Sequence, residues 1–120
     1  MIFGIGCDLV EIARVARAAK NPRFLAKCFS AEELAAYRMR GDAYLAGNFA
    51  AKEAVVKAAG CGFRGFWPRE IEILRNEMGA PYVKISQATL LKLGILETHI
   101  INISISNEKN MVVAMAIIGK

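Results

Sequence analysis

Two carboxylates and one lysine carry most of the chemistry that this sequence of 120 residues offers. Glu53 and Lys57 lie four residues apart in GNFAAKEAVVKAAG, residues 47–60, and with Phe49 they fall on one stripe of a helix. Asp8 comes near the end of an apolar stretch, where an ionised carboxylate is costly unless it is paired or bound to a metal. Two carboxylate ligands with open positions for phosphate and water suit Mg²⁺. Together with the charge of Lys57, they predict a site for a divalent cation and a phosphate group.

The same spacing has a simpler interpretation. Glu53 and Lys57 could form an i, i+4 ion pair on a helix surface, a contact worth only about 0.3–0.5 kcal/mol. Asp8 would then be unrelated to either residue, because their separation in sequence says nothing about their distance in space. Five alanines on the same helix would let a backbone or a ligand approach closely: Ala50, Ala51, Ala54, Ala58 and Ala59. Spacing alone leaves both interpretations open.

The positive charge of the chain is concentrated in one N-terminal segment. The net charge is +5, and residues 14–40 contain seven basic and two acidic residues, which accounts for all of it. Arg14, Arg17 and Lys20 recur every three residues, so a helix would present them on one face. Such a face steers an acidic protein partner, although a merely solvated face fits as well. No nucleic acid partner is expected, because the segment has few aromatic residues and no helix-turn-helix or RNA-binding pattern.

Length and composition limit the class of protein. A chain of 120 residues and 13.1 kDa has room for one domain, residues 1–120. Its 55% hydrophobic content and mean hydropathy of +0.32 favour an oligomer that hides apolar surface. Three cysteines and one histidine at wide spacing exclude a structural zinc site within one chain. No secretion-signal pattern opens the chain and no apolar run spans a bilayer, so we expect a cytoplasmic protein without a membrane partner.

The elements that must position these residues are predicted by local patterns. Residues 1–10 are apolar and predict a strand that ends near Asp8. A helical pattern starts at Glu11 and is broken by Asn21-Pro22. A short helical segment then leads to Phe29.

Two further helices are marked by capping residues. Ser30 and Glu33 form a capping box, which predicts the start of a helix. The longest helix follows, with Asp42 as its expected cap, and runs to Ala59. Gly60 then ends it, as glycine does at many helix C-termini.

The second half of the chain predicts strands. Residues 70–75 and 82–85 form one hairpin, and residues 99–106 and 111–118 form another. Residues 87–93 predict a short helix between them. Helices that come first and strands that follow are typical of an α+β fold with an antiparallel sheet.

Five motifs in order cover nearly the whole chain. They are GIGCDLVEIARV, RFLAKCFSAEELAAY, NFAAKEAVVKAAG, WPREIEILRNEMGAPYV and the closing ISIS pattern. The G-I-G-x-D-x-V-E start and the F-x-x-K-E-x-x-x-K-A-x-G helix are specific in combination, although either alone would be weak. Together the motifs resemble holo-acyl-carrier-protein synthase, the small single-domain type of 4′-phosphopantetheinyl transferase.

The resemblance implies a fold, a reaction and a partner. N-terminal helices would pack on an antiparallel sheet, and the enzyme would move 4′-phosphopantetheine from coenzyme A to a serine of apo-acyl carrier protein, releasing adenosine 3′,5′-bisphosphate. By the same resemblance Asp8 and Glu53 bind Mg²⁺ and Lys57 contacts a phosphate, and these three are the expected catalytic residues. Arg14 and Arg17 of the first helix would dock the acidic carrier protein. A homotrimer is expected, with each active site between two protomers.

The resemblance also assigns residues to coenzyme A. Phe49, Lys57 and Gly60 belong to the matching helix motif and are expected contacts of this co-substrate. Asn48 and Asn107 stand where the family usually has an arginine and a histidine near the nucleotide. Asparagine donates a hydrogen bond without a charge, and charge-assisted contacts to phosphate are roughly twice as strong. We therefore expect weaker coenzyme A binding unless Arg64 or another loop residue supplies the charge.

Two alternatives share this chemistry in part. The chain could bind coenzyme A or a carrier protein with weak or no transferase activity, as the two asparagines would allow. It could also serve a carrier protein of secondary metabolism, which would change its specificity and leave its reaction the same.

Overall fold

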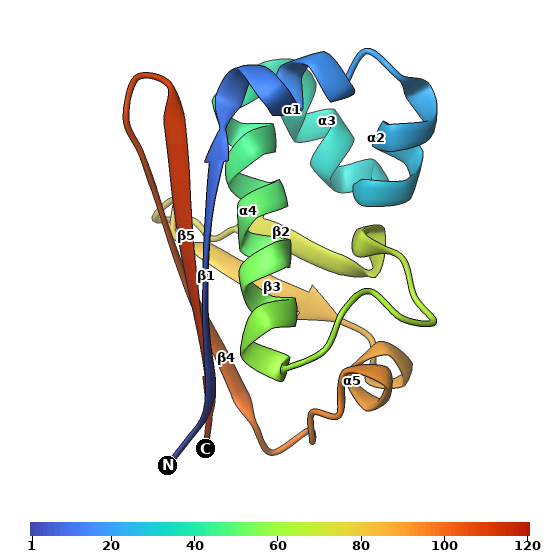
Figure 1. Cartoon of the computed structure of the whole chain (residues 1–120), viewed down its shortest axis with the longest axis vertical. Coiled ribbons are helices and arrows are strands. Elements are labelled where there is room, and N and C mark those ends of the chain that lie inside the picture. Colours follow the sequence, from blue (N-terminus) through green and yellow to red (C-terminus); the bar gives the residue numbers. More distant parts are fainter.

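A long helix lies along one face of a three-stranded antiparallel sheet and forms the centre of the molecule (Figure 1). The computed structural model describes residues 1–120. The helix is α4 (Asp42–Ala59), and the strands follow the order β1 (Ile2–Glu11), β5 (Met111–Gly119) and β4 (Ile100–Asn107). The first strand of the chain therefore pairs with the last, and one core of 21 buried hydrophobic residues joins sheet and helix.

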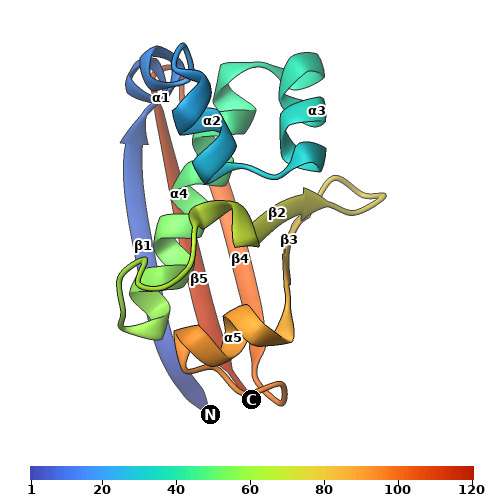
Figure 2. The ribbon, with the colours of Figure 1, turned by 90° about the vertical axis from the view of Figure 1, so that its right-hand side faces the viewer.

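The remaining elements surround α4 at its ends and along one side (Figure 2). Three short helices gather at one end: α1 (Ile12–Ala18), α2 (Pro22–Cys28) and α3 (Ala31–Arg40). A separate hairpin of β2 (Ile71–Arg75) and β3 (Pro81–Ile85) follows a 3-10 turn, η1 (Pro68–Glu70), and lies on the side away from β1. Helix α5 (Gln87–Leu93) lies at the same end of the molecule as the chain termini. The predicted α+β class is confirmed, with two antiparallel sheets in place of the single sheet expected.

Two glycines of β1 let α4 approach the sheet at backbone distance. A Cβ atom placed on Gly4 would lie 1.9 Å from the carbonyl oxygen of Ala58, and one on Gly6 would lie 1.9 Å from that of Ala54. No side chain fits there, so the alanines of α4 rest directly on the strand. This contact sets the position of Asp8, two residues after Gly6.

The predicted helix ends are confirmed at two of three places. Ser30 and Glu33 form the expected capping box of α3, and Gly60 ends α4 in the left-handed conformation with φ of 77°. The prediction that Asp42 caps α4 is wrong, because Gly41 holds the capping position and Asp42 is the first helical residue. The Asp42 carboxylate instead accepts a hydrogen bond from the hydroxyl of Tyr37.

The first strand is longer than expected. We predicted that it ends near Asp8, but β1 continues to Glu11, and Asp8 is paired with Ala114 of β5. The sheet ladder with β5 extends the strand over residues whose own pattern is ambiguous. Asp8 is therefore presented from a rigid strand interior and not from a strand end.

A fully buried ion pair joins the helices to the hairpin. The Glu33 carboxylate lies 2.7 Å from the Lys52 ammonium, and both side chains are almost without solvent contact. Glu33 also accepts hydrogen bonds from Asn48 Nδ2 and from the backbone N–H groups of Ser30 and Ile73. Burial lowers the pKa of Lys52, against the opposing effect of Glu33. We call Glu33, Asn48 and Lys52 the buried polar network.

The outer face of the three-stranded sheet is apolar and uncovered. Alternate residues point away from α4, and among them Ile5, Leu9, Met115 and Ile117 are between 40% and 64% exposed. An exposed apolar sheet face of this kind marks an interaction surface. No helix of the protein has the length and apolar character needed to span a bilayer.

The buried polar network generates a stability prediction. Glu33→Gln removes the charge that compensates Lys52, so the variant should lose about 3–5 kcal/mol of unfolding free energy in a urea titration. The neighbouring residue Glu32 is exposed and offers a matched control. Glu32→Gln should change the unfolding free energy by less than about 0.5 kcal/mol. Equal losses in the two variants would contradict this account of the network.

Candidate active site

Asp8 and Lys57 meet at the contact between β1 and α4. The Lys57 Nζ atom lies 2.9 Å from Asp8 Oδ1 and also donates to the carbonyl oxygen of Cys7 at 3.0 Å. The structure therefore brings together two of the residues that the sequence singled out. The surface pair between Glu53 and Lys57 is not formed, because Lys57 points to the strand. Its hydrogen bond with Asp8 is the main cause that raises the pKa of Lys57.

Glu53 lies one turn earlier on α4 and has no hydrogen-bond or ion-pair partner. Burial raises the pKa of its carboxyl group, and the nearby charge of Asp8 raises it further. Lys57 and Arg14 act in the opposite direction and lower this pKa. Glu53, Asp8, Lys57 and Arg14 thus form one electrostatic cluster, which we call the carboxylate site.

The donor set of the carboxylate site fits a hard divalent cation. Asp8 and Glu53 offer carboxylate oxygens that repel each other, and Glu53 has nothing else to bind. The chain holds no cluster of three acidic, histidine or cysteine residues that could enclose a metal. A site with two protein carboxylates leaves positions for water and phosphate oxygens, which is the pattern preferred by Mg²⁺.

Phe49 of the predicted α4 stripe precedes Glu53 in the sequence, and Gly60 of the same motif follows Lys57. Phe49 is half-buried, with its ring 5.8 Å from that of Phe24 on α2. Gly60 ends the helix three residues after Lys57 and leads into an irregular loop. Phe49 therefore ties α2 to α4, and Gly60 ends the helix close to the lysine.

The two predicted docking arginines point into different surroundings. Arg14 is near enough to Glu53 to lower its pKa, so it belongs to the edge of the carboxylate site. Arg17 lines a groove of about 490 Å³ with Lys20, Asp42 and Lys109, between α1 and the turn that joins β4 to β5. Helix α1 ends at Ala18, so Lys20 lies beyond the helix whose face we expected it to share.

The two asparagines also differ. Asn48 has no exposed surface, and its amide donates to Glu33 Oε2 and to the carbonyl of Ile73. Its oxygen accepts a hydrogen bond from Arg75, so its polar atoms are all engaged within the protein. Asn107 is exposed and lines a cavity of about 380 Å³. Of the pair, only Asn107 has a surface that a ligand could touch.

Comparisons with known proteins show the family of the chain. Residues 4–115 match the family model described as the 4′-phosphopantetheinyl transferase superfamily. The chain belongs to this superfamily. A "Holo-[acyl-carrier-protein] synthase" from Clostridium botulinum is 46% identical over 121 residues, with 98% of each chain covered. The predicted family and enzyme class are confirmed: the chain is a phosphopantetheinyl transferase related to such synthases over its length.

Solved structures of the superfamily share the whole fold. The holo-[acyl-carrier-protein] synthase of Neisseria meningitidis has a TM-score of 0.86 and 35% identity, and all of both chains is covered. That of Bacillus anthracis, a complex with coenzyme A (3′,5′-ADP), has a TM-score of 0.84 and 28% identity, with 100% of this chain and 98% of that one covered. Similarity over the full length leaves no part of this transferase outside the shared architecture.

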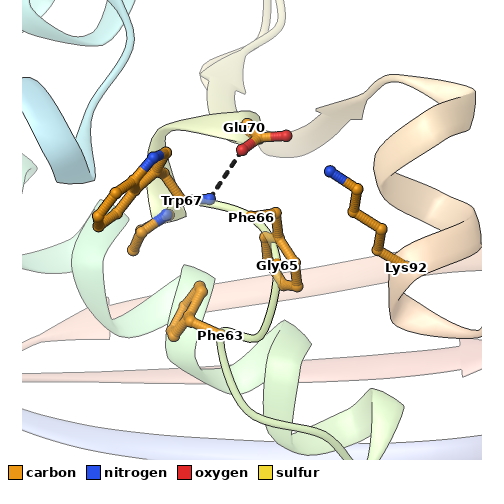
Figure 3. A pocket seen from close by; sticks show the side chains of 7 residues that line it. Phe63, Gly65, Phe66, Trp67, Glu70 and Lys92 are labelled. Atoms are coloured by element: carbon orange, nitrogen blue, oxygen red, sulfur yellow. Dashed lines mark hydrogen bonds between the residues drawn. The ribbon is translucent and has the colours of Figure 1, made fainter.

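A cavity of about 590 Å³ in this transferase lies outside the predicted site residues (Figure 3). Phe63, Phe66 and Trp67 of the loop after α4 line it, and Lys92 of α5 extends toward Glu70. Glu70 is engaged by the backbone N–H of Trp67 at 2.7 Å, which is the main cause that lowers its pKa. The sequence marked this loop only by its glycine and aromatic content. No pattern within the loop or within α5 predicts that the two segments lie side by side.

The repulsion within the carboxylate site leads to a prediction about metal binding. A cation bound by Asp8 and Glu53 in the folded state should raise the melting temperature of the wild type as Mg²⁺ is added. Glu53→Gln should abolish this rise, and Glu77→Gln in the hairpin turn should retain it. A Mg²⁺-dependent rise that persists in Glu53→Gln would contradict the assignment of Glu53.

The same repulsion sets the sign of a pH effect without metal. The pKa of Glu53 is higher in the folded protein than its ordinary value of 4.5, so the folded state holds its proton more tightly. Unfolding free energy should therefore fall as pH rises from about 4.5 through the folded pKa. Urea titrations of the wild type and of Glu53→Gln across this pH range check the prediction. The unfolding free energy of the wild type, relative to that of Glu53→Gln, should fall as the pH rises.

Proposed function

We propose that this enzyme transfers 4′-phosphopantetheine from coenzyme A to a serine of an acyl carrier protein in a Mg²⁺-dependent reaction, releasing adenosine 3′,5′-bisphosphate. The convergence of Asp8, Glu53 and Lys57 at one contact carries the proposal, because two carboxylates and an ammonium group suit a metal-bound diphosphate. Several relatives carry the name holo-[acyl-carrier-protein] synthase. We infer that it works in the cytoplasm, where its three free cysteines would stay reduced.

Three residues of the carboxylate site would take part in the transfer itself. Asp8 and Glu53 would hold the cation, which neutralises charge on the diphosphate when it is bound. Lys57 is half exposed and anchored on Asp8, so its ammonium group can contact a phosphate oxygen without rearrangement. The serine hydroxyl would lose its proton to water as its oxygen attacks the β-phosphate. The bond between the β-phosphorus and the oxygen of the adenosine bisphosphate would break. Lys57 would stabilise the negative charge left on that leaving group.

Mass spectrometry of a carrier protein tests the proposal. Incubation of an apo-acyl carrier protein with the enzyme, coenzyme A and Mg²⁺ should add the mass of phosphopantetheine and release adenosine 3′,5′-bisphosphate. Asp8→Asn and Glu53→Gln should lower the rate at least a hundredfold, while Glu77→Gln should leave it unchanged. Binding of coenzyme A without any gain in mass would support a binding module instead. A gain in mass seen only with carrier proteins of secondary metabolism would mean that the partner is one of these proteins and that the reaction is as proposed.

Arg14 and Arg17 are proposed to dock the acidic carrier protein. Both are exposed on α1, at the edge of the carboxylate site and in the adjoining groove. Arg17→Glu should raise the KM for carrier protein at low salt with little change in kcat, because exposed charges act mainly on encounter. Arg14→Glu should raise this KM and also shift the pH profile of kcat, since it removes a charge that lowers the pKa of Glu53. Arg38→Glu, with the same charge change on α3, should alter neither.

A homotrimer is proposed as the working form, with each site completed by a second protomer. The exposed apolar face of the three-stranded sheet supplies the surface for such an assembly. A closed ring is favoured because an open head-to-tail contact would build filaments. Sedimentation equilibrium at micromolar concentration should give three times the chain mass of 13.1 kDa. Leu9→Lys on that face should shift the protein to the single-chain mass.

A further inference from the structure

A small cavity between α4 and the two sheets gathers positive charge without a matching acid. Its volume is about 380 Å³. Arg40 at the end of α3, Tyr44 and Gly47 on α4, Arg75 at the end of β2 and Asn107 at the end of β4 line it. No acidic residue is part of the lining, and none of the residues of the carboxylate site reaches it.

The two arginines lie against the same aromatic ring. The guanidinium carbon of Arg75 is 4.8 Å from the centre of the Tyr44 ring, and that of Arg40 is 5.6 Å from it. The only ion pairs of the protein are those of Lys52 with Glu33 and Lys57 with Asp8, so neither arginine has a carboxylate partner. Burial is the main cause that lowers the pKa of Arg75, and Arg40 adds to it. Two like charges held together in this way favour an anion between them.

The orientation of Arg75 is built into the interior. Its Nη2 atom donates to Asn48 Oδ1 at 2.9 Å. Asn48 is fixed in turn by Glu33 and by the carbonyl of Ile73, at 2.9 and 3.0 Å. The buried polar network therefore orients the guanidinium group of Arg75 before any ligand arrives.

We propose that Arg75, oriented by Asn48 and assisted by Arg40, binds the 3′-phosphate of coenzyme A and determines the preference for this phosphate. The choice of ligand rests on the proposed function, whereas the anion site rests on the cavity itself. A guanidinium group presents paired N–H donors that match two phosphate oxygens. Asn48 contributes no charge itself, and it acts through the arginine that it holds. An asparagine at position 48 was expected to weaken the binding of coenzyme A. Arg75 of β2, 27 residues further along the chain, supplies the missing positive charge.

Coenzyme A and dephospho-coenzyme A test the proposal because they differ only in this phosphate. Calorimetric titration of the wild type should show at least about tenfold tighter binding of coenzyme A. Arg75→Gln should reduce that preference about tenfold and leave the affinity for dephospho-coenzyme A within twofold. Arg75→Lys, which keeps the charge without the paired donors, should lie between the two. Arg64→Gln, a loop arginine outside the cavity, is the matched control and should behave as the wild type.

Three results would overturn the proposal. Equal weakening of both ligands in Arg75→Gln would make Arg75 a structural residue, and the melting temperature of the variant would show this directly. Loss of the preference for coenzyme A in Arg64→Gln would show that Arg64 of the loop, and not Arg75, binds the 3′-phosphate. A wild type that binds both ligands equally would remove the subsite altogether. Failure of the proposed function is a separate result, because it would appear as absent transfer to carrier protein.

Discussion

The carboxylate of Glu33 is the interaction on which the rest of the structure depends. It is withdrawn from solvent and accepts from four donors, which belong to Ser30, Asn48, Lys52 and Ile73. These donors come from the start of α3, the middle of α4 and the strand β2, so one charged group joins the two consecutive helices to a strand that lies further along the chain. A buried charge is tolerated only when its pairing is this complete. An alternative packing of the hairpin would take the N–H of Ile73 from Glu33 and the carbonyl oxygen of Ile71 from Lys52. The network therefore favours a single arrangement.

That arrangement gives the two sides of α4 different chemistry. Gly6 of β1 lets one side of the helix rest on the strand, and there Lys57 reaches Asp8 beside Glu53. The side that faces the hairpin carries Asn48, which holds Arg75. An α-helix turns 100° per residue, so a shift of one residue along α4 would break both alignments. Both sites therefore depend on the register of α4, which the glycine contact and the buried polar network set together.

The polar groups divide into those the fold satisfies and those it leaves unpaired. No buried side-chain nitrogen or oxygen atom lacks a hydrogen-bond partner. The unpaired charges lie nearer the surface, where Glu53 faces Asp8 and where Arg40 and Arg75 flank Tyr44. Electrostatically, the first group favours a cation and the second an anion. Pairing of polar groups is thus complete in the interior, and the charges without an ion-pair partner lie where a ligand could reach them.

Local features of this protein were set by its sequence, and the connections between distant residues were decided by tertiary packing. The capping box of Ser30 and the terminal Gly60 follow from contacts within a few residues, so the sequence alone predicted them. The motifs around Asp8, Glu53 and Lys57 likewise predicted the family. The choice of Asp8 as the partner of Lys57 could not be predicted, because the i, i+4 spacing of Glu53 and Lys57 fits a helix pair equally well. The burial of Asn48 and its bond to Arg75 were also beyond the sequence, since both depend on where the hairpin packs against α4, and residue spacing does not encode contacts between separate elements.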